Sequence, residues 1–180
     1  MCIRDRNYWT GNEGKVFEAE FSKWVGVRYA IAVSNGSVAL DLALKSLDLK
    51  KGDEVIVTPR SFVASATSVV NCGAKPVFAD VDLSSGNLSS KTIIRKITKK
   101  TKAIICVHLG GLPCEMDEIL KLAKKFNLYV IEDCAQAHGA FYKNKSVGSI
   151  GHIGAWSFCQ DKIITTGGEG GMITTNDKKL

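Results

Sequence analysis

Hydrophobic and polar positions follow two different periods along the chain. Short apolar runs rich in β-branched residues, typical of buried strands, alternate with stretches whose apolar residues recur at helical spacing. We expect strands at 29–34, 54–59, 75–81, 103–109, 129–134, 154–159 and 171–176. We expect helices at 12–25, 38–47, 61–71, 89–98 and 115–126, with Gly26 ending the first of them.

This alternation predicts an α/β fold. Strands separated by amphipathic helices favour a mostly parallel central sheet with helices on both faces, which is a three-layer α/β/α arrangement. We expect 29–34 to be a buried strand of that sheet. Ligands of such sheets bind at the carboxyl ends of the strands. The polar residues that follow the predicted strands are therefore the candidates for a site.

The overall composition excludes few classes of protein. With 45% hydrophobic and 23% charged residues, the chain is typical of a globular protein, and 180 residues suit one domain. No apolar window approaches the roughly 20 residues of a membrane helix, so no membrane association is expected. The net charge is +6, but the lysines at 95–102, 121–125 and 143–145 have no interleaved aromatic residues. An anionic small ligand fits this charge better than a nucleic acid.

The cysteines point to a reducing compartment. There are six, none in a Cys-x-x-Cys pair, so we expect no structural zinc site. Cys106, Cys134 and Cys159 lie in apolar runs and are predicted to be buried free thiols of a cytoplasmic protein.

Both ends of the chain are unusual for a domain. The leading MCIRDR has no apolar periodicity, and we expect residues 1–6 to be a non-native leader. The chain stops directly after the strand predicted at 171–176. We therefore expect residues 7–180 to be part of a larger domain.

The segment SNGSVAL contains the first site candidates. Gly36 and Ser37 begin a helix directly after a strand, where free backbone amides and the helix dipole favour a phosphate. The alternative is a simple serine helix cap. The Gly-x-Gly-x-x-Gly fingerprint of nicotinamide enzymes is absent. Lys162 precedes the glycines of TTGGEGG, whereas the lysine of a nucleotide-binding P-loop follows its glycines.

Polar residues at later strand ends are the second group of candidates. Glu132 and Asp133 are adjacent on a strand, so their side chains point to opposite faces and only one can enter a given site. Gln136 could reach the same ligand from the following turn. Ser157 is polar within an apolar strand, and Lys162 could be a phosphate clamp, a surface charge or a nucleophile. Taken alone, each of these residues also has an ordinary structural explanation.

Two further residue types are weaker candidates. Phe62, after a predicted strand, would most often belong to the core. His108, His138 and His152 do not have metal-ligand spacing, and we interpret them as structural.

The order of these motifs resembles one known family. From about Tyr8 to Asp177 the chain is similar to the DegT/DnrJ/StrS family of nucleotide-sugar aminotransferases, which use pyridoxal 5′-phosphate (PLP) on the fold-type-I scaffold. The motifs that carry the resemblance are SNGSVALDLAL, GDEVIVTPRSFVAS, GAKPVFADVD, TKAIICVHLGG, VIEDCAQAHGA and SFCQDKIITTGGEGG. They occur in the order found in the family.

The resemblance implies a role for each candidate. Lys162 matches the nucleophilic lysine that bonds to the cofactor, and Asp133 matches the carboxylate at the pyridine nitrogen. Gln136 matches the polar residue beside the cofactor hydroxyl, and Phe62 the aromatic residue that stacks on the ring. Gly36, Ser37, Val38 and Ser157 match the phosphate-binding positions.

The resemblance also implies an activity and its alternatives. The family transfers an amino group from an amino acid, here expected to be glutamate, to a keto-sugar linked to a nucleotide. Its members are homodimers with a smaller C-terminal domain, which this chain lacks, so we expect the chain alone to be inactive. Related sugar dehydratases have histidine in place of Lys162, and Cys159 stands where the family often has histidine. Another PLP-dependent reaction, or a non-catalytic regulatory homologue that binds a nucleotide sugar, remain the alternatives.

Overall fold

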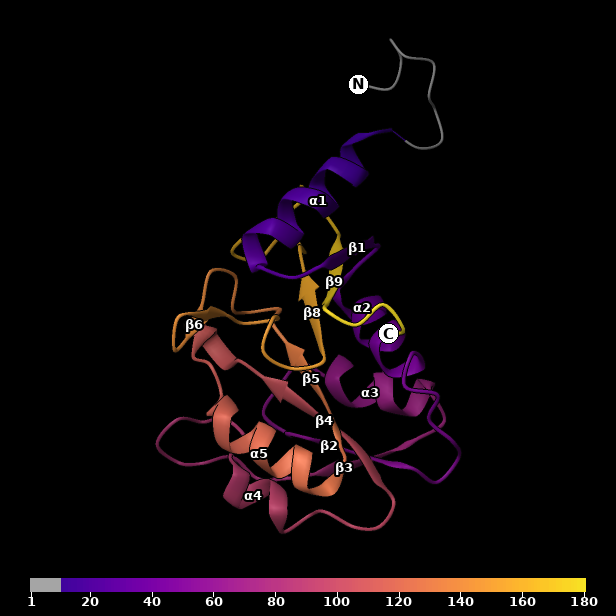
Figure 1. Ribbon diagram of the computed structural model, residues 1–180, viewed down its shortest axis with the longest axis vertical. Helices are drawn as coiled ribbons and strands as arrows, with labels where there is room; N and C mark the ends of the chain where they lie inside the picture. The colour runs from indigo at the N-terminus through magenta and orange to yellow at the C-terminus, as the bar shows by residue number, and fades with distance from the viewer. Residues whose placement is uncertain (1–10) are drawn as a thin grey trace.

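The structure, a computed structural model, describes residues 11–180 (Figure 1). The leader expected at residues 1–6 lies outside this range. The helices are α1 (Glu13–Val25), α2 (Gly36–Lys45), α3 (Ala64–Asn71), α4 (Ser90–Ile94), the 3-10 turn η1 (Leu109–Gly111) and α5 (Met116–Phe126). The strands are β1 (Tyr29–Val33), β2 (Glu54–Val57), β3 (Lys75–Phe78), β4 (Thr101–Val107), β5 (Tyr129–Asp133), β6 (Phe141–Tyr142), β7 (Lys145–Ser146), β8 (Ile153–Ser157) and β9 (Gly171–Thr175).

A seven-stranded sheet organises the fold, with strand order β1-β9-β8-β5-β4-β2-β3. The strands from β3 to β8 in this order pair in parallel. Strand β9 runs antiparallel to both of its neighbours, β8 and β1. The carboxyl ends of strands β1, β4, β5 and β8 therefore all lie on the same side of the sheet. The prediction of a mostly parallel α/β sheet is confirmed.

Helices cover both faces of this sheet (Figure 1). Side chains such as Val57 and Ile105 pack with α2 and α3 on one face. Their neighbours in sequence, Ile56 and Ile104, point the other way and pack with α4 and α5. Helix α1 joins that second face further along the sheet, through an aromatic cluster around Trp156. The predicted three layers are present.

Strand β1 is not the buried strand that the sequence predicts. Among residues 11–180 it pairs with β9 alone, as the outermost strand of the sheet, and Ile31 is 50% exposed. One side of β1 still packs near α1, and its residues are therefore as apolar as those of a central strand. Composition alone does not distinguish an outermost strand from a central one.

Local boundaries also differ from the prediction. Helix α4 covers only 90–94 of the predicted 89–98, and α3 begins at Ala64 rather than at residue 61. The small hairpin of β6 and β7 was not predicted, because strands of two residues are too short to show a period. Its turn contains two left-handed residues, Lys143 (φ 47°) and Asn144 (φ 65°). No helix within residues 11–180 has the length and apolar character that a membrane crossing requires.

A buried carboxylate ties three segments of the second face together. Glu132, on β5, accepts hydrogen bonds from the backbone N–H groups of Gly148 (3.0 Å), Ile150 (2.8 Å) and Gly151 (2.6 Å). Its Oε2 also lies 3.0 Å from Nε2 of His108. The N–H of Cys114 donates to Nδ1 of His108 (3.1 Å), so the imidazole carries its proton on Nε2 and donates it to Glu132.

This network predicts a large loss of stability when Glu132 is removed. Glu132→Ala leaves an imidazole N–H and three backbone N–H groups unpaired in the interior, and we expect the free energy of unfolding to fall by about 3–5 kcal/mol. Urea denaturation would measure the change. Glu118→Ala, on the exposed face of α5, is the control and should stay within about 0.5 kcal/mol. Equal midpoints for the two variants would contradict the assigned role.

Candidate active site

The carboxyl ends of the central strands open into a cavity of about 420 Å³. Every predicted site residue except Val38 contributes to its wall: Gly36, Ser37, Phe62, Asp133, Gln136, Ser157 and Lys162. These residues are distant in sequence, and the shared direction of β1, β5 and β8 brings them together. The cavity lies where ligands of parallel sheets bind.

One end of the cavity is formed by the start of helix α2. Asn35 caps the helix, because its side chain accepts a hydrogen bond from the N–H of Val38 (2.9 Å). The serine cap considered from the sequence is therefore not the one that forms. The amide of Val38 is already engaged, and Val38 does not line the cavity, whereas Gly36 and Ser37 do. The first helical N–H groups have no partner within their own helix, which suits them to an anion.

Gly36 has no side chain because strand β8 passes directly against it. A Cβ at this position would lie 2.6 Å from Cβ of Ser157, well inside van der Waals contact. The close approach brings the Ser157 hydroxyl beside the amides of α2. Ser157 is buried, and its Oγ accepts a weak hydrogen bond from the N–H of Cys159 (3.4 Å). Helix start and strand end thus form one polar end of the cavity.

Asp133 is the buried carboxylate of the site. Its Oδ2 accepts from the hydroxyl of Ser65 (3.0 Å), and its Oδ1 from the N–H of Ala135 (3.2 Å). Burial raises the pKa of the Asp133 carboxyl, and these bonds, together with the charge of Lys162, offset part of the rise. Asp133 and Glu132 point to opposite faces of the sheet, as predicted.

Sequence reasoning did not identify Ser65 as a site residue. It lies on α3, where Ala64, Ser65 and Ser68 form a buried face of small residues. The four-residue spacing of Ser61 and Ser65 in the predicted helix was an available signal. It does not indicate which carboxylate the serines face, because Asp133 is 68 residues away in the chain.

Gln136 has a fixed orientation at the cavity wall. Its Oε1 accepts a hydrogen bond from the N–H of Gly110 (2.8 Å), within the turn η1. A backbone N–H can only donate, so the amide oxygen must face Gly110 and the amide NH₂ is left as a donor. Gln136 can therefore donate a hydrogen bond to an oxygen of a ligand.

Lys162 lies on the loop between β8 and β9. Its side chain is 23% exposed, and its Nζ is 3.5 Å from Oδ1 of Asp161. Hydrogen bonds from the N–H of Thr166 to Phe158 (3.2 Å) and from the Cys159 thiol to Glu169 (3.1 Å) hold the loop. Cys159 is partly exposed and lines the cavity, which corrects its prediction as a buried thiol. Glu169 is a further lining residue that sequence reasoning missed.

Phe62 is 68% exposed at the cavity. The core interpretation of this residue is therefore wrong. An exposed aromatic ring beside a polar cavity is available to stack on a planar ligand.

The histidines lie outside the cavity wall as the structure describes it. His152 accepts a hydrogen bond from the N–H of Val130 (2.9 Å), and His138 packs against Trp156 and Phe158. Ligand-type atoms of His108, Glu132 and Cys134 lie within 4.8 Å of one another. However, protein donors and acceptors already satisfy His108 and Glu132, so this cluster is explained as a structural network.

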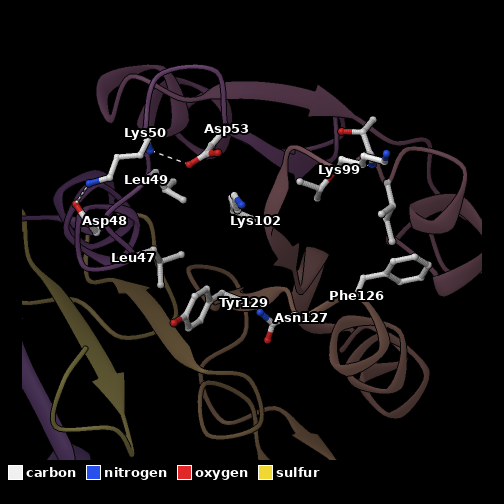
Figure 2. Close-up of a pocket in the computed structure, with 13 residues that line it drawn as sticks. Leu47, Asp48, Leu49, Lys50, Asp53, Lys99, Lys102, Phe126, Asn127 and Tyr129 are labelled. Atoms are coloured by element: carbon white, nitrogen blue, oxygen red, sulfur yellow. Dashed lines mark hydrogen bonds and ion pairs between the residues drawn. The ribbon is translucent and has the colours of Figure 1, made fainter.

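A second and larger cavity, of about 730 Å³, lies at the opposite edge of the sheet (Figure 2). It is formed by segments at the amino ends of β2, β4 and β5, and Lys50, Lys99 and Lys102 lie around it. Lys50 is paired with Asp48 at 2.6 Å. Size does not decide between the two cavities. The smaller one holds the buried carboxylate, the oriented amide and the helix start, whereas the larger is an open groove between surface loops.

The residues of the smaller cavity fit PLP. A helix start with an adjacent serine suits a phosphate, a buried carboxylate suits a pyridinium nitrogen, and an amide donor suits a phenolic oxygen. Lys162 supplies an amine at the same cavity. Together with the three-layer sheet, this arrangement is typical of fold-type-I PLP-dependent enzymes.

Comparison with known proteins agrees with this class. Residues 1–180 match the DegT/DnrJ/EryC1/StrS aminotransferase family, and the chain belongs to that family. It is 52% identical over 170 residues to the GDP-perosamine synthase of Escherichia coli O157:H7, covering 94% of this chain and 46% of that protein. It is 46% identical over 173 residues to the dTDP-3-amino-3,6-dideoxy-alpha-D-galactopyranose transaminase of Aneurinibacillus thermoaerophilus, covering 96% of this chain and 48% of that protein.

A solved structure is closely similar as well. The aminotransferase from Psychrobacter cryohalolentis superposes with a TM-score of 0.96 at 64% identity, covering 99% of this chain and 46% of that one. The chain thus spans about half the length of the curated relatives and structures that it matches. The cofactor of this family is PLP.

The contact of Gly36 with Ser157 predicts an effect on stability. Gly36→Ala forces the two backbones apart at the cavity, and we expect a destabilisation of about 1–3 kcal/mol. Gly14→Ala is the matched control: Gly14 lies in the first turn of α1 with open space around its Cβ position. That variant should be neutral or up to about 1 kcal/mol more stable, because alanine favours the helix. Thermal unfolding of both variants checks the difference, and equal stabilities would refute the close contact.

Proposed function

We propose that the protein carrying this chain transfers an amino group from an amino acid, with glutamate as the donor, to the keto-sugar of a nucleotide sugar. The observation that supports this most directly is the convergence of Lys162 and Asp133 on one cavity beside the start of helix α2. Relatives named for GDP-, dTDP- and UDP-linked amino sugars support the substrate class. They differ in nucleotide, so the proposal leaves the nucleotide and the sugar carbon open.

The binding residues act together on the cofactor. Gly36 and Ser37, through backbone amides, and Ser157, through its hydroxyl, bind the phosphate. Asp133 accepts a hydrogen bond from the protonated ring nitrogen, and Gln136 donates to the ring hydroxyl. Phe62 stacks on the ring and limits the access of water.

Lys162 performs the proton transfers. When bound, PLP supplies an aldehyde that bonds to amines and a ring that accepts the electron pair released from the donor. The Lys162 amine would hold the cofactor until the amine of the amino-acid donor takes the place of the lysine amine. The freed amine would then remove the proton from the donor's α-carbon as a general base and deliver a proton to C4′ of the cofactor as a general acid. The second half-reaction repeats these transfers in reverse with the keto-sugar.

Two alternatives are separated by specific observations. An amine at position 162 argues against a dehydratase of the same scaffold, in which the resemblance implies histidine. A regulatory homologue without turnover gives no reason for an amine and a buried carboxylate to meet at one cavity. Incubation with glutamate and then with a nucleotide keto-sugar distinguishes all three by the mass of the product.

We further propose that the active enzyme is a cytoplasmic homodimer about twice the length of this chain. The relatives support the length, because the chain covers less than half of each. Residues 7–180 would then be part of a large domain that a smaller C-terminal domain follows.

Replacement of Lys162 provides the main test. The full-length protein purified with PLP should show visible absorbance that borohydride removes, and peptide mass mapping should place the cofactor on the Lys162 peptide. Lys162→Ala should lose this adduct and nearly all transamination, while Lys121→Ala, on the exposed face of α5, should retain both. Substantial turnover by Lys162→Ala, or an adduct on another lysine, would refute the assignment.

The isolated 180-residue chain provides a second test. We expect it to show no transamination under conditions in which the full-length protein turns over, because the resemblance implies that a smaller C-terminal domain and a partner subunit complete the enzyme. Product formation is measured for both proteins at equal concentration with saturating PLP. Measurable turnover by the short chain would contradict this expectation.

A further inference from the structure

We propose that Ser65 is a positioning residue for the reaction, and that with Ser61 it forms a hydroxyl chain that keeps Asp133 in its ionised form. The hydroxyl of Ser65 lies 3.0 Å from Oδ2 of Asp133, and Oγ of Ser61 lies 2.7 Å from Oγ of Ser65. This proposal rests on the proposed function, because the ionised carboxylate matters only if it faces the ring nitrogen of PLP.

The number of available protons fixes the direction of the chain. Each serine has one hydroxyl proton, and an ionised carboxylate can only accept. Ser65 must therefore donate to Asp133, so its proton is not available to Ser61. It follows that Ser61 donates to the oxygen of Ser65, which makes Ser65 a stronger donor. Protonation of Asp133 at Oδ2 would remove this acceptor and require both hydroxyls to turn.

The position of the chain connects the interior with the cavity. Asp133 and Ser65 are buried, whereas Ser61 is partly exposed and lines the cavity. Ser65 faces the carboxylate from the first turn of α3, and Ser61 contacts Ser65 from the segment that leads into this helix. The helix therefore contributes a buried hydroxyl to the site in addition to Ala64, which lines the cavity.

Other titratable groups near Asp133 come from different elements. His108 follows β4, Lys162 lies on the loop after β8, and Cys134 follows Asp133 on its own segment. Burial raises the pKa of Asp133, and the contacts of Ala135 and Ser65 lower it, followed by the charge of Lys162. Loss of the Ser65 hydroxyl therefore shifts the pKa of Asp133 upward. With PLP bound, the proton shared by the carboxylate and the ring nitrogen should move towards the carboxylate.

The experiment compares Ser65→Ala with Ser68→Ala in the full-length protein. Ser68 is equally buried on α3 but lies outside the hydroxyl chain, so it controls for packing. Alanine is smaller than serine and favours a helix, so both variants should fold. The readouts are the dissociation constant of PLP and the ¹⁵N resonance of PLP labelled at the ring nitrogen, neither of which needs turnover.

For Ser65→Ala we expect PLP to bind about tenfold more weakly, which corresponds to the loss of one hydrogen bond to a charged group. The ¹⁵N resonance should move towards the unprotonated ring, and Ser61→Ala should move it less in the same direction. Ser68→Ala should match the wild type in both readouts. This set of results supports the proposal.

Three results would overturn it. Wild-type affinity and resonance in Ser65→Ala would remove the role of Ser65 while leaving the proposed function intact. Equal changes in Ser65→Ala and Ser68→Ala would reduce the effect to the packing of α3. A wild-type protein that binds no PLP would refute the proposed function, and this inference with it.

Discussion

Strand β5 ends in two adjacent carboxylates, and the geometry of a strand sends them to opposite faces of the sheet. Glu132 is enclosed by an imidazole and three backbone N–H groups, and so connects β4, β5 and the 146–151 segment. Asp133 faces the cavity and the hydroxyl of Ser65. Because the two share a peptide bond, the network that holds Glu132 also limits how far Asp133 can move. The scaffold and the candidate chemistry are thus connected at one point of the chain.

The opposite end of the cavity depends on the absence of a side chain. Gly36 lets the first turn of α2 approach Ser157, so a helix start and a strand hydroxyl lie next to each other. This contact is between backbones from distant parts of the sequence, and the shared direction of β1 and β8 makes it possible. The groups proposed to bind an anion therefore belong to regular elements, whereas Lys162 lies on a loop.

Much of this architecture could be predicted from the sequence. The two hydrophobic periods gave the three layers and the mostly parallel sheet, and the strand-end rule placed Asp133, Ser157 and Gly36 at one edge. The exposure of β1 could not be predicted, since edge and central strands share their β-branched composition. The contributions of Ser65 and Glu169 to the site could not be predicted either, because tertiary contacts determine which residues they face. Val38 was correctly predicted to lie in the turn at the start of α2. The sequence did not indicate that its N–H is already bonded to the side chain of Asn35.

The loop that carries Lys162 joins two strands that pair directly with each other. Ser157 and Gly171 face one another in the antiparallel pairing of β8 and β9, so both ends of the loop are fixed to neighbouring backbone. A parallel connection would need a crossover helix, but this one needs none. The distance between its ends is therefore independent of its length, and the cost of added residues grows only slowly with loop size. A change in the length of this loop therefore need not move the sheet, but it would disturb the hydrogen bonds through which Thr166 and Glu169 hold Lys162 beside the cavity.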